Sequence, residues 1–158
     1  MQTLVPPTMP FAESTDPAEA APMPEALIAV YNRTVDSIKG YAKMVEKAEP
    51  TFRDTAERFR ALHARHAGDL ARLLATMGIE ADADGTLMGT VNQAVVTFRA
   101  FFDDIDEDVM DQIRSGEDWV LKAFDSAIAE EAHPTRAASL REMQTELTAL
   151  LADTSHLG

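Results

Sequence analysis

The sequence predicts an all-α protein, a four-helix bundle with a short crossover helix between the second and third bundle helices. Three observations indicate this fold. Apolar residues recur at alternating steps of three and four, which is the seam of helices packed lengthwise. Alanine is plentiful and β-branched runs are short, so helices are favoured over strands. The break at Glu49-Pro50 is so short that its flanking helices must be antiparallel.

The first helix is expected over residues 25–48, between Pro24 and the Glu49-Pro50 break. Asp36 is expected on its solvent face, about 150° from the apolar stripe. The side chains expected to face inward are Leu27, Tyr31, Val35, Ile38, Ala42 and Val45, with Thr34 and Tyr41 on the flanks of the stripe.

The second helix carries the longest regular pattern in the chain, and two histidines, His63 and His66, lie at its centre. Thr51 and Asp54 are predicted to cap the start of this helix. Gly78 is predicted to end it in a left-handed conformation. The inward positions, from residue 52 to residue 77, are Phe52, Ala56, Phe59, His63, His66, Leu70, Leu73 and Met77.

Three features are expected between the second and third bundle helices. Residues 80–85 resemble part of a calcium loop, but Val91 stands where the bidentate glutamate would be, so a solvated turn is expected. Residues 87–102 are expected to form the crossover helix, about 20 Å long. The acidic cluster, residues 103–108, suits the start of the next helix, where negative charge is favoured.

The third and fourth bundle helices are separated by His133-Pro134, and Pro134 suits the first turn of the fourth. Glu117 falls on an otherwise apolar stripe of the third helix, whereas Trp119 falls to one side. The expected inward positions are Val109, Ile113, Gly116 or Glu117, Val120, Phe124 and Ala127 in the third helix and Leu140, Met143 or Gln144, Leu147, Leu151 and Thr154 in the fourth.

Composition limits the classes of function. Residues 1–24 hold six of the eight prolines and are expected to form a disordered tail ahead of one bundle domain, residues 25–158. A formal net charge of -13 with no basic face argues against nucleic-acid and membrane-surface partners. The lack of cysteine excludes disulfides and thiolate sites. With no membrane-length apolar run and no signal peptide, a cytoplasmic location is expected.

One polar layer is expected at mid-height in the bundle, made of Thr34, His63, His66, Glu117 and Gln144. Buried polar groups without a partner are costly, so these side chains should satisfy one another, a water or a metal. In the first interpretation the layer is metal-free, and Glu117 accepts hydrogen bonds from both imidazoles, which raises their pKa values. In the second, His63, His66 and Glu117 hold one zinc, iron or manganese ion.

Over residues 26–155 the chain resembles the ferritin-like superfamily, and more narrowly a bacterial branch that is known only as a domain of unknown function. The resemblance implies a four-helix bundle with a crossover between the second and third helices. It is carried by Asp36-x-x-x-Gly40-Tyr41, the second helix with its end at residues 70–78, Ser115-Gly116-Glu117-Asp118 and Gln144.

Di-iron members of that superfamily use one glutamate from each of two helices and a Glu-x-x-His pair from each of the other two. The resemblance puts His63-Ala-Arg-His66 at the second-helix pair, with histidine in place of the carboxylate, and Glu117 at the third-helix carboxylate. Asp153-Thr-Ser-His156 has the right spacing but lies off the stripe, and Asp36 lies on the wrong face. A complete di-iron centre is therefore not expected.

Two functions follow. The first is a metal-free or degenerate-site interaction or stress-associated protein, self-associating as a homo-oligomer, with contacts through Trp119, the phenylalanines at 98, 101 and 102, and the acidic cluster. The second is a metal-binding protein that uses His63, His66 and Glu117 to hold iron, zinc or manganese. No complete catalytic signature is present, and a hydrolase lacks a nucleophile, so an enzymatic role is not expected.

Overall fold

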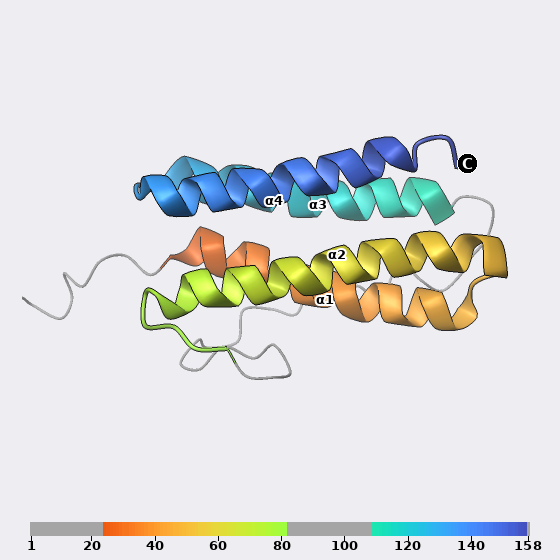
Figure 1. The fold of residues 1–158 in the computed structure, drawn as a ribbon, viewed down its shortest axis with the longest axis horizontal. Coiled ribbons are helices and arrows are strands. Elements are labelled where there is room, and N and C mark those ends of the chain that lie inside the picture. Colours follow the sequence, from red (N-terminus) through yellow and green to blue (C-terminus); the bar gives the residue numbers. More distant parts are fainter. Residues whose placement is uncertain (1–23, 82–108, 158) are drawn as a thin grey trace, which may run out of the picture.

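A computed structural model describes residues 24–81 and 109–157, which form four α-helices (Figure 1). They are α1 (Glu25–Lys47), α2 (Pro50–Ala75), α3 (Val109–Glu130) and α4 (Pro134–Asp153). The described part of the chain is thus an all-helical bundle, as predicted. The tail, the calcium-like turn, the crossover helix and the acidic cluster lie outside the described residues, apart from Pro24 of the tail and the first two residues of the turn.

The four helices are arranged as two antiparallel hairpins, α1 with α2 and α3 with α4 (Figure 1). The hairpins pack through α1 against α3 and through α2 against α4. Along the chain, α2 finishes at one end of the bundle and α3 starts at the other, so these two helices run in the same direction (Figure 1). The connection between them must therefore join opposite ends of the bundle.

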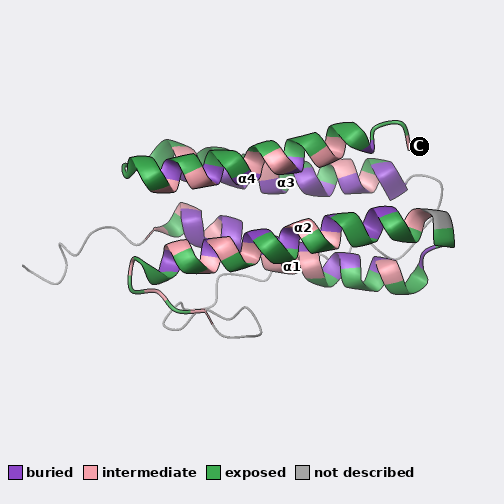
Figure 2. Cartoon of the chain, viewed as in Figure 1, coloured by how far each residue is buried: buried purple, intermediate pink, exposed green. Residues whose placement is uncertain are grey.

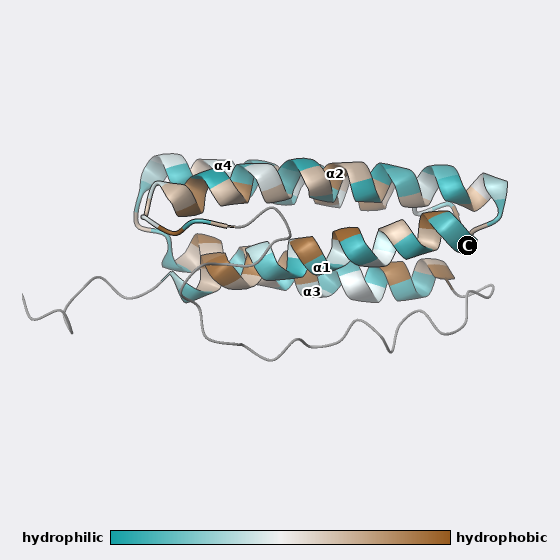
Figure 3. Ribbon diagram, turned by 90° about the horizontal axis from the view of Figure 1, so that it is seen from below, coloured by the Kyte–Doolittle hydropathy of each residue, from teal (hydrophilic) through white to brown (hydrophobic). Residues whose placement is uncertain are grey.

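The core consists of the inward faces of all four helices (Figure 2). The predicted stripe of α3 is confirmed in full. Leu140, Met143 and Leu147 of α4 are buried, and so is Thr154, which directly follows α4. Figure 3 shows hydrophobic and hydrophilic stretches alternating along the helices, as amphipathic helices require. No helix among the described residues is both long enough and apolar enough to span a membrane.

The predicted stripe of α1 is wrong in its second half. Ala42 is exposed, whereas Tyr41 and Met44 are buried. Since α1 packs against both α2 and α3, its buried face is wide and includes the small residues Ser37 and Gly40. Serine and glycine do not register in an apolar pattern, which is why the sequence pointed to the wrong face here.

The ends of α2 differ from the prediction at the start and agree with it at the finish. Pro50 occupies the first turn and Glu49 makes no side-chain capping bond, so the predicted cap by Thr51 and Asp54 is wrong. Proline suits this position because the first turn leaves its N–H groups unpaired in any case. Gly78 has φ of +79°, as predicted, and its N–H donates to the carbonyl of Ala75 at 3.0 Å.

Candidate functional site

A cluster of three buried polar side chains joins three helices at the centre of the bundle. Tyr41 of α1, His63 of α2 and Glu117 of α3 are all buried. The Tyr41 hydroxyl donates a hydrogen bond to Glu117 Oε1, and His63 Nε2 lies 2.8 Å from the same oxygen. One carboxylate oxygen therefore links α1, α2 and α3 in the core.

Aromatic packing holds the Tyr41–His63–Glu117 cluster in place. The Tyr41 ring stacks on Phe59 with 5.3 Å between centroids and on His63 with 5.7 Å. These two ring contacts restrict the rotation of the tyrosine ring, so its hydroxyl stays directed at Glu117. The cluster is thus built on rigid helices with little freedom to rearrange.

Tyr41 is the functional neighbour that sequence reasoning missed, because it was assigned to the flank of α1. Burial raises the pKa of Tyr41 well above its usual value, and the charge and hydrogen bond of Glu117 act in the same direction. The phenol therefore keeps its proton at neutral pH and remains a donor to Glu117. The one signal in the sequence for such a neighbour is Glu117 itself, because a buried acid requires hydrogen-bond donors such as a hydroxyl.

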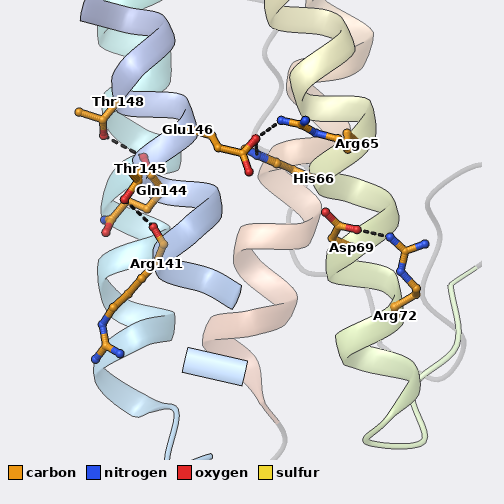
Figure 4. A network of polar contacts seen from close by, with 9 residues as sticks. All are labelled: Arg65, His66, Asp69, Arg72, Arg141, Gln144, Thr145, Glu146 and Thr148. Atoms are coloured by element: carbon orange, nitrogen blue, oxygen red, sulfur yellow. Dashed lines mark hydrogen bonds and ion pairs between the residues drawn. The ribbon is translucent and has the colours of Figure 1, made fainter. Parts of the chain in front are cut away.

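His66 is buried next to this cluster but does not join it. Its ring is perpendicular to that of His63 with 6.4 Å between centroids, and its Nε2 lies 3.6 Å from Glu146 Oε2 on α4 (Figure 4). Burial, together with the charges of the nearby His63 and Arg65, lowers the pKa of His66 from 6.5 to about 4, against an opposing effect of Asp69. The predictions that Glu117 bonds to His66 and raises its pKa are therefore wrong.

Two other members of the predicted polar layer bond elsewhere. The Thr34 hydroxyl donates to the Val30 carbonyl of its own helix at 2.7 Å. The Gln144 amide donates to Asp125 Oδ1 at 2.6 Å, which links α4 to α3 outside the cluster. Both residues satisfy their polar atoms locally, so the layer is smaller than the sequence indicated.

The acids that the resemblance considered for helices 1 and 4 also lie apart from the cluster. Asp153 is exposed and pairs with Arg58, whose hydrogen bond and charge lower the pKa of that carboxyl. Asp36 was expected on the solvent face but is half-buried. This burial raises the pKa of Asp36, and the charge of Lys39 partly offsets the increase.

The outer seam between α2 and α4 is a charged groove, and it is lined in part by Glu146, the acid that His66 faces. Arg65 pairs with Glu146 across the seam, and Arg72 pairs with Asp69 along α2 (Figure 4). Arg58 and Asp153 repeat the first pairing seven residues away on each helix, as antiparallel helices in register require. The groove has a volume of about 440 Å³, and its surface ion pairs contribute little stability.

The residues predicted as metal ligands do not converge in this arrangement. Within residues 24–81 and 109–157, no group of three or more His, Asp or Glu side chains is placed to hold a metal ion. His63 and Glu117 bond to each other, while His66 faces Glu146. The three-ligand site therefore stays a prediction, and it requires His66 to turn toward Glu117.

Four atoms in this region have no hydrogen-bond partner although they are buried. They are Nδ1 of His63, both ring nitrogens of His66, and Oε2 of Glu117. Unpaired buried polar atoms are rare in native proteins and each costs stability, so this is the part of the core with the greatest capacity for an additional polar contact.

These features define the protein class as an all-helical bundle with one buried acid bridging three helices. The chain belongs to the family described as Domain of unknown function (DUF2383), whose model matches residues 24–131. The match covers α1, α2 and α3 and so includes all three residues of the Tyr41–His63–Glu117 cluster. Neither the curated proteins nor the solved structures yield a match to this chain.

Proposed function

We propose that this protein is a non-catalytic, ferritin-like interaction protein of the cytoplasm. It associates with protein partners through its outer surface, and the first of these partners is a second copy of the same chain. The observation that supports it is the internal use of Glu117. Its Oε1 already binds Tyr41 and His63. The acid therefore acts as a tie between helices.

Access supports the same conclusion. A catalytic acid or base must reach a substrate, either directly or through one water. Glu117 is only 1% exposed, and neither the α2/α4 groove nor the groove between α1 and α3 is lined by a residue of the cluster. The charged outer face is what remains available to a partner.

Sedimentation velocity of the untagged full chain over a wide concentration range tests self-association. We expect a discrete oligomer whose size is unchanged in Glu117→Gln, since that side chain is buried and the substitution keeps its shape. A single monomeric species at all concentrations would refute self-association.

A metal-binding function is the second candidate, and the unpartnered atoms of His63, His66 and Glu117 favour it. Two imidazoles and one carboxylate suit zinc, iron or manganese. On this proposal, His66 would turn away from Glu146 so that one of its free nitrogens and the free Glu117 oxygen face the same ion.

Elemental analysis of protein purified without a tag tests this candidate. Near-stoichiometric metal is expected, lost in a His63→Ala/His66→Ala variant and retained in His133→Ala/His156→Ala. The control removes the other two histidines of the chain, both of which are exposed. Metal well below one equivalent, with no difference between the two variants, would eliminate the candidate.

A further inference from the structure

A groove between α1 and α3 presents the one large hydrophobic side chain that is exposed among the described residues. Trp119 is 58% exposed, and the groove beside it has a volume of about 240 Å³. Methyl groups of Ala26, Ala29 and Ala123 line this groove, together with the cationic side chains of Arg33 and Lys122. Lys122 pairs with Asp118 at 2.8 Å, so the site combines an aromatic plane, a small apolar surface and the positive charge of Arg33.

The arrangement of Trp119 is held by Arg33. The Arg33 guanidinium lies 5.2 Å from the centre of the indole ring, and its Nη1 donates to the Trp119 carbonyl at 2.7 Å. This cation–π contact and the hydrogen bond together fix the orientation of the indole ring. The tryptophan is therefore a preorganised surface.

We propose that the chain's own N-terminal segment, residues 1–23, docks in this groove and covers Trp119. The segment contains five prolines and no lysine or arginine, and its acids are Glu13, Asp16 and Glu19. Proline-rich segments bind grooves lined by aromatic side chains because their extended conformation costs little entropy to order. The acids complement the cations of the groove in a chain that is otherwise strongly acidic.

The position of the groove fits the length of the segment. The segment ends next to Pro24, and Ala26, only two residues later, already lines the groove. Arg33 is nine residues beyond Pro24, which is about 14 Å along α1. An extended proline-rich chain that turns back covers this distance in about five residues. Glu19 then lies level with Arg33.

The composition of the chain makes a direct test simple, since Trp119 is the only tryptophan and there is no cysteine. A nitroxide quencher attached at Ala20→Cys in the full chain should lower Trp119 emission at least twofold relative to the same label at Ala64→Cys. Ala64 is an exposed residue of α2, which packs against α1 and α4 and not closely against α3. Equal emission from the two labelled proteins would overturn the proposal.

Two further measurements identify the occupant and the contacts. Quenching should be independent of dilution. A second experiment mixes a labelled chain that carries Trp119→Phe with unlabelled chain, so that any quenching must come from a different molecule. Quenching in this mixture would assign the groove to a second copy and overturn the proposal. Asp16→Lys/Glu19→Lys should reduce the quenching toward the control, whereas Glu13→Lys, farther from the groove, should not. Quenching that withstands the double substitution would contradict the charged contacts.

The docking does not depend on the proposed function, because it is measured on the monomeric chain at high dilution. If the groove is covered by the segment and sedimentation also shows an oligomer, the two surfaces are separate. If the oligomer is absent but the quenching is present, the proposed function fails and the docking stands.

Discussion

Buried His66 should make the protein less stable as the solution is acidified. Its pKa falls from an ordinary 6.5 to about 4 in the folded protein. Between these values the unfolded chain binds the proton and the folded chain does not, so the stability contribution is complete above pH 6.5 and is lost as the pH falls toward 4. At 1.36 kcal/mol per pKa unit, the loss is about 2 kcal/mol at pH 5 and about 3 kcal/mol below pH 4.

Urea unfolding at pH 7.5 and pH 5 measures this contribution when the wild type is compared with His66→Leu. Other groups titrate in both proteins, so the difference between them isolates His66. The wild type should lose about 2 kcal/mol more than the variant on going to pH 5. A His133→Leu control, which alters an exposed histidine, should follow the wild type. Equal losses in the wild type and His66→Leu would refute the burial argument.

Three further substitutions test two glycines, one inside α2 and one after its end, and the charged surface. Gly68→Ala should stabilise the protein by about 0.5–1 kcal/mol in urea unfolding, because a methyl group there meets no atom within 4 Å and alanine favours a helix. A methyl group at Gly78 also meets no atom within 4 Å, but Gly78 has φ of +79°, so Gly78→Ala should lower the unfolding free energy by about 1–2 kcal/mol. Changes of the same sign at both glycines would contradict this explanation. Arg65→Ala should change the unfolding free energy by less than about 1 kcal/mol, because the side chain is exposed, and a loss above 2 kcal/mol would mean that the charged seam stabilises the bundle.

The sequence predicted the helices well because helical periodicity is a local property. The buried faces of α3 and most of α2 follow directly from steps of three and four residues. The burial of His63, His66 and Glu117 was correctly predicted in the same way. Exposed Trp119 also agrees with its place off the stripe.

What periodicity does not determine is which neighbour a buried side chain faces. His63 and His66 differ by three residues, so their directions around α2 differ by about 60°. That rotation is enough to turn His63 toward Glu117 of α3 and His66 toward Glu146 of α4. The wrong prediction for the pKa of His66 follows from this one angle, because the ring does not bond to Glu117 and burial has the largest effect on its pKa.

Tyr41 holds Glu117 in a link between helices. A double-mutant cycle with Tyr41→Phe and Glu117→Gln measures this interaction directly. Phenylalanine keeps the ring that stacks on Phe59 and removes only the hydroxyl. Urea unfolding of the four proteins at pH 7 should give a coupling free energy of at least about 1.5 kcal/mol, as expected of a buried hydrogen bond to a charged acceptor. Effects of the two substitutions that add to within about 0.3 kcal/mol would mean that Tyr41 and Glu117 do not stabilise the bundle through this hydrogen bond.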